Sequence, residues 1–184
     1  MPDEKPSNES WKHEPPYKIQ PAGEFGHVYW RGRCQCGRVE YWLNMEKPLD
    51  AKFCHCRGCQ VLHGAPFQWA AIFQKSAMTF RTSFDSLNFY NSAEKLRQHK
   101  PPCKVSCAHC HSPIMDEGRN TVLLFPEAID FGHGAGQGKG HEREVRERRG
   151  LFAPSCHIFY SQRVIDIDDG KPKWSGMNDE SERI

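Results

Sequence analysis

Seven of the nine cysteines in this 184-residue chain lie in three tight clusters. In chain order these are Cys34-x-Cys36, Cys54-x-Cys56-x-x-Cys59 and Cys107-x-x-Cys110. Such spacings are typical of zinc ligands, because one short loop can turn several sulfurs towards a single ion. Two thiols plus two complete one tetrahedral site, whereas three leave a second ion one protein ligand short. The clusters therefore predict two zinc ions per chain, one structural and one open to reaction.

A disulfide framework is the alternative explanation for so many cysteines. Residues two apart, such as Cys34 and Cys36, are poorly placed to bridge each other but can close around one ion. The N-terminal stretch is polar and lacks the apolar core of a secretory signal, so we expect a cytoplasmic protein with reduced thiols. No stretch approaches the ~18 apolar residues that a membrane span needs. These observations favour metal binding over disulfides.

The apolar stretches predict a mainly β fold. Short runs rich in aromatic and β-branched residues, separated by Gly, Pro and polar turns, are typical of strands. They cover 28–30, 39–43, 67–73, 78–84, 87–90, 121–125, 157–160 and 164–167. Two stretches are expected to be helical instead: a single turn over 56–63, which Gly64 ends, and the charged stretch 141–149.

The length suits one domain with modest tails. Residues 1–25 are rich in Pro, Ser, Glu and Lys and predict a flexible arm. The domain is expected over 26–177, followed by a C-terminal tail over 178–184. Inside it, the glycine-rich and charged stretch 132–149 is interpreted as a mobile insertion that carries a solvated helix, and the alternative is a lid over a pocket.

The charge balance argues against a nucleic-acid partner. Lys and Arg number 25 against 23 Asp and Glu, which gives a formal net charge of +2. The basic residues are scattered and form no broad electrostatic footprint for phosphate backbones. We expect a small-molecule substrate and no membrane partner, and the oligomeric state is left open.

The central cluster predicts chemistry at sulfur. Three thiolates outweigh the charge of Zn²⁺ and weaken it as a Lewis acid towards water, but an incoming thiol would still bind as the nucleophilic thiolate. In the alternative, a fourth protein ligand closes this site and both ions are structural. The candidates for that ligand are Cys103, Cys156, His55, His63 and His157.

Three histidines are candidate catalytic residues: His55, His63 and His157. Imidazole titrates near neutral pH and can move a proton between substrate atoms. A structural hydrogen-bonding role is the alternative for each. Three aromatic side chains either line an apolar pocket or belong to the core, and these are Phe67, Trp69 and Phe159.

The motifs together resemble one known family. They are RGRCQCGRV from Arg31 to Val39, CHCRGC from Cys54 to Cys59 with Gly64 to Phe67 after it, CAHC from Cys107 to Cys110, and Phe152 to Pro154 ahead of His157 to Phe159. In order and spacing, from Trp30 to Trp174, they resemble the glutathione-dependent formaldehyde-activating family, which also includes centromere protein V.

The resemblance implies several coiled antiparallel β-sheets with few short helices, stapled by zinc. It assigns the first and third cysteine pairs to the structural ion and the central three to a catalytic ion, in agreement with the count of ligands. It also implies a zinc-dependent carbon-sulfur lyase, with glutathione as the thiol cosubstrate of a small carbonyl compound. His55 stands where formaldehyde-activating members tend to have Gly, so the carbonyl substrate stays open.

Two other functions remain as alternatives. One is a tailoring lyase or isomerase of a specialised metabolite, with the same zinc loop and a different pocket. The other is a zinc-stabilised binding module that catalyses nothing.

Overall fold

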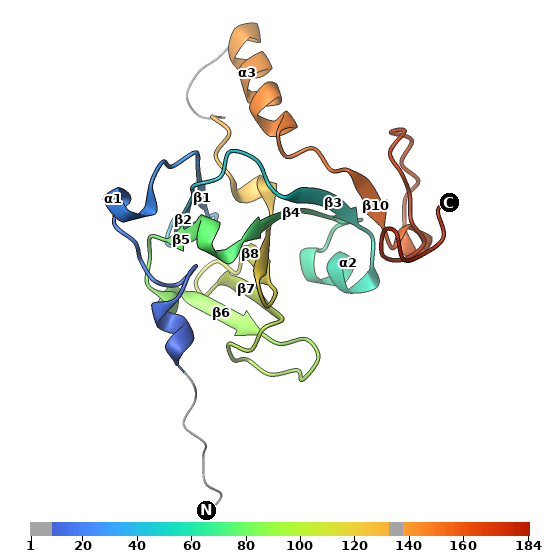
Figure 1. Ribbon diagram of the computed structural model, residues 1–184. Coiled ribbons are helices and arrows are strands. Elements are labelled where there is room, and N and C mark those ends of the chain that lie inside the picture. Colours follow the sequence, from blue (N-terminus) through green and yellow to red (C-terminus); the bar gives the residue numbers. More distant parts are fainter. Residues whose placement is uncertain (1–8, 133–137) are drawn as a thin grey trace, which may run out of the picture.

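The computed structural model describes residues 9–132 and 138–184. Short strands dominate it, with few helices between them (Figure 1). The strands are β1 (Trp30–Arg33), β2 (Glu40–Leu43), β3 (Asp50–Cys54), β4 (Gln68–Gln74), β5 (Met78–Phe80), β6 (Leu87–Tyr90), β7 (Cys103–Cys107), β8 (Pro113–Glu117), β9 (Thr121–Leu124) and β10 (Cys156–Ile158). The α-helices are α1 (Ala22–Phe25), α2 (Arg57–His63) and α3 (Lys139–Gly150), and the 3-10 turns are η1 (Ser10–His13), η2 (Lys75–Ala77), η3 (Phe84–Ser86), η4 (Pro126–Ala128) and η5 (Tyr160–Gln162).

The strands form two sheets. One has the order β1-β2-β5, and the other has the order β10-β3-β4-β9-β8-β7-β6. Every pair is antiparallel except β10 with β3, which are parallel. The parallel pair arises because β10 follows α3 and reaches the sheet edge by a long connection rather than a hairpin. The expected mainly β fold of one small domain is confirmed, with this pair as the exception to its antiparallel character.

Most of the expected strands form, but one expected strand is absent from the structure and some observed strands were not expected. The run 164–167 is not a strand, and its Val164 and Ile165 side chains are exposed. Conversely, β3 and β7 form from Asp, Lys and Cys-containing segments that carry little β-branched content. Pairing with cross-strand neighbours, rather than intrinsic strand propensity, makes these segments strands.

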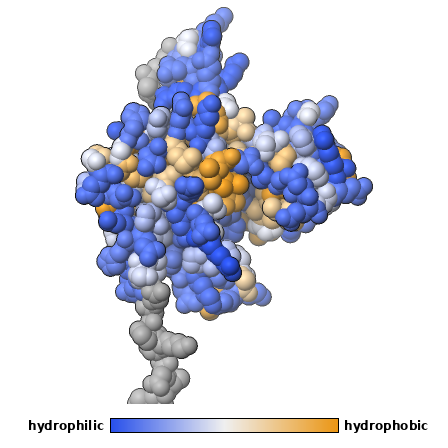
Figure 2. Space-filling view, in the orientation of Figure 1, coloured by the Kyte–Doolittle hydropathy of each residue, from blue (hydrophilic) through white to orange (hydrophobic). Residues whose placement is uncertain are grey.

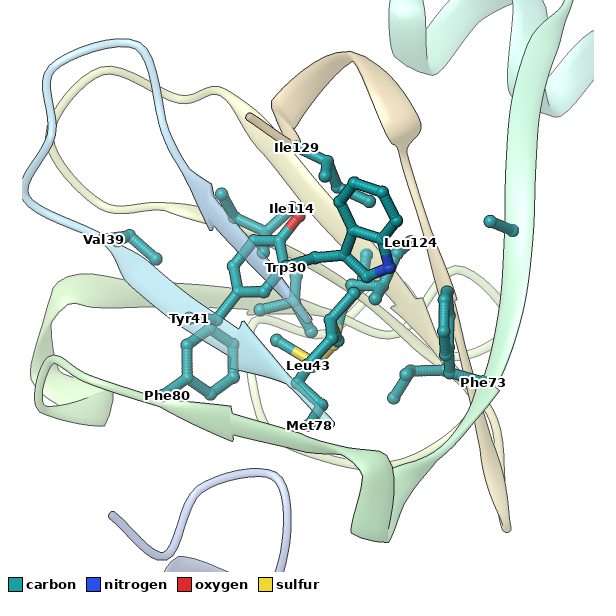
Figure 3. Packing of buried hydrophobic residues seen from close by; sticks show 14 of the residues in the cluster. Trp30, Val39, Tyr41, Leu43, Phe73, Met78, Phe80, Ile114, Leu124 and Ile129 are labelled. Atoms are coloured by element: carbon teal, nitrogen blue, oxygen red, sulfur yellow. The ribbon is translucent and has the colours of Figure 1, made fainter. Parts of the chain in front are cut away.

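The core joins the two sheets. Tyr41 and Leu43 of the small sheet belong to one buried cluster with Phe73, Ile114 and Leu124 of the large sheet, and each is fully buried (Figure 3). Burying such a side chain contributes about 1.5–3 kcal/mol relative to leaving it exposed. On the surface, apolar residues gather at the centre of one face and polar side chains surround them (Figure 2).

Part of the segment expected to be a flexible arm packs onto this body. The Tyr17 side chain is 4% exposed, and its hydroxyl donates to Glu117 Oε2 at 2.5 Å. Trp11 stacks on His99 with 3.9 Å between ring centroids. These two aromatic side chains anchor the segment by apolar contacts, which its composition, rich in Pro, Ser, Glu and Lys, did not indicate. Residues 1–8 of the expected arm lie outside the described residues.

The expected surface helix is confirmed as α3. Of its residues, Val145 reaches the core cluster, and the Arg148 guanidinium lies over the Trp30 ring at 5.2 Å. Residues 133–137 of the expected mobile insertion lie outside the described residues, so the structure shows only the anchored helical part.

The C-terminal tail forms hydrogen bonds with the rest of the domain, since the Ile184 amide donates to the Lys173 carbonyl at 2.8 Å. In the described ranges, no helix has both the length and the apolar character that crossing a bilayer requires.

Candidate metal centres and the adjoining cavity

The first and third clusters meet at one point. Cys34 and Cys36 lie in the turn between β1 and β2, while Cys107 ends β7 and Cys110 lies in the turn after it. The Sγ–Sγ distances are 3.5 Å for Cys34–Cys36 and 3.9 Å for Cys36–Cys107, and all four sulfurs lie within 4.8 Å of one another. Zn–S bonds of about 2.3 Å at tetrahedral angles place sulfurs about 3.8 Å apart. The donor set therefore fits a four-thiolate zinc ion.

Three of the four sulfurs in this cluster have a hydrogen-bond donor nearby. The Val39 amide donates to Cys34 Sγ at 3.3 Å, and the His109 amide donates to Cys107 Sγ at 3.4 Å. The Ser112 hydroxyl lies 3.2 Å from Cys110 Sγ, and this hydrogen bond lowers the pKa of Cys110 to about 5. Metal binding requires deprotonated cysteine, and the surroundings of Cys110 favour that form.

The central cluster forms where β3 passes into α2. Cys54 ends the strand, Cys56 is the N-cap of the helix and Cys59 lies in its first turn, with the three sulfurs within 4.8 Å of one another. The Cys59 amide donates to Cys56 Sγ at 3.4 Å. Hydrogen bonds from Cys54 and Cys59 hold the pKa of Cys56 far below its usual value. Gly64 ends α2 in the left-handed conformation, with φ of 58°, which glycine adopts readily.

Among the described residues, no fourth His, Cys, Asp or Glu ligand atom joins these three sulfurs. Cys156 packs in the same apolar cluster, but its sulfur accepts a hydrogen bond from the Ser155 hydroxyl at 3.8 Å. Cys103 lies elsewhere, with its sulfur 3.6 Å from Glu117 Oε2. Three thiolates without a fourth protein ligand fit an open zinc site rather than a closed one.

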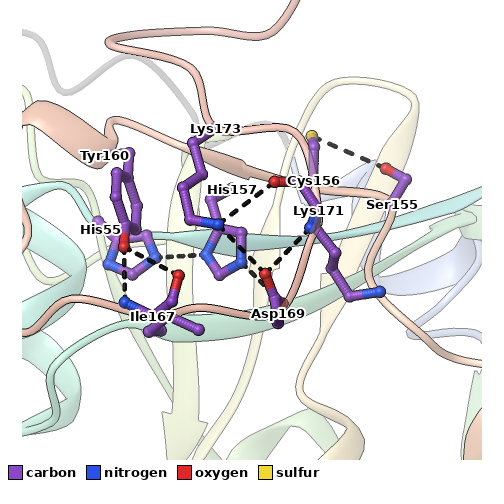
Figure 4. Close-up of polar contacts among 9 residues, drawn as sticks. All are labelled: His55, Ser155, Cys156, His157, Tyr160, Ile167, Asp169, Lys171 and Lys173. Atoms are coloured by element: carbon purple, nitrogen blue, oxygen red, sulfur yellow. Dashed lines mark hydrogen bonds and ion pairs between the residues drawn. The ribbon is translucent and has the colours of Figure 1, made fainter. Parts of the chain in front are cut away.

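His55 and His157 are fully buried and form a hydrogen-bonded row with Asp169 (Figure 4). His55 Nε2 lies 2.8 Å from His157 Nδ1, and His157 Nε2 lies 3.0 Å from Asp169 Oδ2. The carboxylate can only accept, so we assign His157 Nε2 and then His55 Nε2 as the donors along the row. This assignment leaves His55 Nδ1 unprotonated, and that atom is buried with no hydrogen-bond partner.

Electrostatics agree with a neutral His55. Burial is the largest cause that lowers the pKa of His55, to about 4. Burial alone would raise the pKa of Asp169, but hydrogen bonds from His157, the Lys171 amide and Lys173 together outweigh it and hold this pKa at about 2. Lys173 Nζ lies 3.3 Å from Asp169 Oδ1 and adds a second donor. The row is thus an ionised carboxylate that orients two buried imidazoles.

A cavity of about 640 Å³ has His63, Phe67, Gln68 and Trp69 among its lining residues, together with Cys34 of the four-cysteine cluster. No cysteine of the central cluster lines it. Two of its lining residues are nevertheless direct neighbours of that cluster: His63 follows Cys59 by one turn of α2, and Gln68 is paired with Cys54 across β3 and β4.

The predicted site residues thus separate into distinct groups. The two sets of cysteines assemble as expected, His55 and His157 come together, and His63 lies apart at the cavity. Of the three aromatic candidates, Phe67 and Trp69 line the cavity, whereas Phe159 packs against the apolar cluster that contains Cys54, Cys59, Cys156 and Ile158. Sequence reasoning missed Asp169, because its acidic run before Gly170 indicates only a turn.

A third group of potential ligands was also missed, namely His99, Cys103 and Glu117. Its carboxylate already accepts from four side chains, and Lys75 Nζ lies 2.6 Å from Glu117 Oε1. A cation in that position opposes metal binding. The group is therefore a satisfied buried ion pair.

The fold and the two cysteine clusters define the class of this protein: a small, mainly β domain whose cysteines fit zinc. The family model described as glutathione-dependent formaldehyde-activating enzyme matches residues 29–162. The chain belongs to this family, whose members are generally enzymes that act on small molecules, and the resemblance seen in the sequence is confirmed.

Other comparisons are sparser. A solved structure of a Rhodobacter sphaeroides protein, a Northeast Structural Genomics target, is similar at 19% sequence identity with a TM-score of 0.44, and the match covers 58% of this chain and 90% of that one. No curated protein matches the chain.

Proposed function

We propose that this protein is a zinc-dependent enzyme of the carbon-sulfur lyase type, which adds a thiol reversibly to a small carbonyl compound. Glutathione is the first thiol to test. The observation that carries the proposal is the cluster of Cys54, Cys56 and Cys59, which has no fourth ligand among the described residues. Two residues that line the cavity are its neighbours in the fold, since His63 follows Cys59 by one turn of α2 and Gln68 pairs with Cys54 across the sheet. In this proposal these three cysteines hold the catalytic ion, and the other four hold a structural ion.

The reaction needs only a proton carrier besides the metal. Zinc bound by the three cysteines would supply an open coordination position in which a substrate thiol stays deprotonated at neutral pH. As the sulfur–carbon bond forms, the C=O double bond becomes a single bond and its oxygen takes up the proton that the thiol lost. No oxidant or reductant is required, and the reverse reaction returns thiol and carbonyl compound.

We assign the proton carrier to His63. It lines the cavity on the same face of α2 as Cys59. Burial lowers the pKa of His63, so its imidazole is neutral at pH 7 and can accept a proton from a thiol. His55 and His157 are enclosed and bonded to each other, which favours a positioning role for them at the loop that carries Cys54 and Cys56.

The test combines zinc analysis with turnover. In the wild type we expect two zinc ions per chain and accelerated exchange between glutathione and ¹³C-formaldehyde, followed by NMR. Cys59→Ala should remain folded, retain one zinc ion and lose the acceleration. Cys156→Ala, which alters a buried cysteine of the same apolar cluster, is the matched control and should retain both ions and activity.

Two results would contradict the proposal. One is a Cys59→Ala protein that keeps both zinc ions, since the central cysteines would then not hold one. The other is a wild type that holds two zinc ions but does not accelerate the addition of glutathione to any of a set of small aldehydes. That result would favour the non-catalytic binding module.

A further inference from the structure

Two glutamines connect a distant segment of the chain to the central cysteine loop, which carries Cys54, Cys56 and Cys59. Gln60 Nε2 donates to the His55 carbonyl at 2.6 Å and to the Gln162 carbonyl at 2.8 Å. Gln162 Oε1 in turn accepts from the Arg57 amide at 2.9 Å. Each glutamine side chain therefore holds a backbone group that lies between two of the central cysteines.

The partners of these side chains fix which group donates. A carbonyl oxygen can only accept, so the Gln60 amide faces His55 and Gln162 with its NH₂ group and uses both N–H donors. A backbone amide can only donate, so Gln162 faces Arg57 with its side-chain oxygen. Gln60 thus acts as a donor and Gln162 as an acceptor.

The bond to Arg57 also satisfies the start of α2. The first four amides of an α-helix have no acceptor within the helix. Arg57 is the first residue of α2, directly after the N-cap Cys56, whose sulfur already accepts from the Cys59 amide at 3.4 Å. With Gln162 as its acceptor, the Arg57 amide is satisfied without a further bond to that sulfur.

The segment that carries Gln162 is itself anchored on both sides. On one side β10 pairs with β3 (Figure 1), and the Ile158 carbonyl accepts from the His55 amide at 3.0 Å. On the other side the Phe159 amide donates to the Gly176 carbonyl at 2.8 Å. The backbone around Gln162 is thus fixed and can hold the cysteine loop in place.

An open zinc site gains from a loop that is held in this way. In the four-cysteine cluster two separate loops supply the sulfurs, whereas in the central cluster one short loop supplies all three. If such a loop became ordered only when the ion bound, the free energy of ordering would reduce the affinity for the ion. Hydrogen bonds that order the loop in advance avoid this loss.

We propose that Gln60 and Gln162 are positioning residues, which hold the central cysteine loop in the arrangement that binds zinc with its fourth position open. Neither side chain contacts the ion or the substrate in this proposal. Their removal should weaken zinc binding at the central cluster and leave the four-cysteine cluster unchanged. That the loop holds zinc rests on the proposed function, whereas the ordering of the loop by the two glutamines does not.

The test measures zinc affinity of the full chain by competition with a colorimetric chelator. The release step that is missing from Cys59→Ala identifies the central ion. Gln162→Met removes the acceptor for the Arg57 amide and should weaken the central ion by about tenfold or more, the range for groups that orient metal ligands. Gln162→Glu keeps an acceptor oxygen at the same position and should retain the affinity of the wild type.

The same change to Glu should have the opposite result at Gln60. Gln60→Glu places an oxygen where the NH₂ group faced two carbonyls, so it should weaken the central ion as Gln60→Met does. Gln98→Met is the matched control, because Gln98 is exposed and its side chain makes no hydrogen bond to any described residue. Gln60 is buried but Gln162 is exposed, so the Gln162 variants decide the test if the Gln60 variants do not fold.

Hydrogen exchange of the Arg57 amide, followed by NMR, is a second measurement that does not depend on turnover. The exchange should become faster in Gln162→Met and stay slow in Gln162→Glu. A role in overall stability alone would instead lower Tm and weaken both zinc ions together.

The proposal is overturned if folded Gln162→Met binds the central ion as tightly as the wild type, if it weakens both ions equally, or if Gln162→Glu loses as much affinity as Gln162→Met. Unchanged zinc affinity in Gln162→Met, with a wild type that catalyses thiol addition, would remove the positioning role and retain the enzyme. Zinc binding that depends on Gln162, in a chain that catalyses no thiol addition, would do the reverse. If the central cluster of the wild type holds no zinc, the proposed function fails, and the exchange rate of the Arg57 amide alone decides whether Gln162 orders the loop.

Discussion

Replacing Tyr17 by Phe removes one hydrogen bond between the N-terminal segment and the large sheet. The Tyr17 hydroxyl donates to Glu117 Oε2 at 2.5 Å, and the carboxylate is almost completely buried. Its other donors remain in the variant, with His99 Nε2 at 2.9 Å and Lys75 Nζ at 2.6 Å. The substitution therefore weakens a buried charge network without leaving Glu117 unpaired.

The expected loss follows from these contacts. A hydrogen bond to a charged group contributes about 1.5–3 kcal/mol. Since Phe fills nearly the same space, the ring packing of Tyr17 against Phe80 and Phe89 should persist, and no cavity cost is added. For a domain of this length each kcal/mol lowers Tm by about 2–4 °C, so we expect a decrease of roughly 3–12 °C.

The assay is thermal unfolding of the zinc-loaded protein, followed by circular dichroism at pH 7. Tyr29→Phe is the matched control, because Tyr29 is 42% exposed and its loss of a hydroxyl should change Tm by less than ~1 °C. An unchanged Tm in Tyr17→Phe would refute the reasoning, and it would mean that the segment before residue 25 does not dock through Glu117.

Two further predictions concern the core and acid stability. In Gly32→Ala the added Cβ would lie 2.1 Å from Cζ of the fully buried Tyr41 ring. We expect the free energy of unfolding, measured in urea, to fall by about 1–3 kcal/mol or more. Gly23→Ala is the control, because its added Cβ meets nothing within 4 Å. A Gly32→Ala protein as stable as the wild type would show that the ring can move aside. Burial alone would raise the pKa of Glu117, but hydrogen bonds from His99, Lys75 and Tyr17 outweigh it and lower this pKa. Its contribution is therefore complete above the unfolded-state pKa of about 4.3 and is lost as pH falls through the lower folded-state pKa. The stability difference between wild type and Glu117→Gln should thus be constant from pH 7 to 5 and shrink below pH 4, and a constant difference throughout would contradict this account.

Local patterns were sufficient for much of this protein. The cysteine clusters could be recognised because the ligands of each loop are separated by one or two residues, so their convergence depends on a short stretch of backbone. The same holds for α2, with Gly64 at its end, and for the charged helix α3. The order and spacing of these motifs also predict the family, as the match over residues 29–162 confirms.

The tertiary structure alone decided the contacts between distant segments. His55 and His157 meet because β10 lies beside β3, and Tyr17 reaches Glu117 across 100 residues of chain. The hydrogen bond from Gln68 to Asp116 likewise depends on how β4 and β8 come together. Such contacts are set by strand order and register, which many residues determine jointly, so no single spacing in the sequence encodes them.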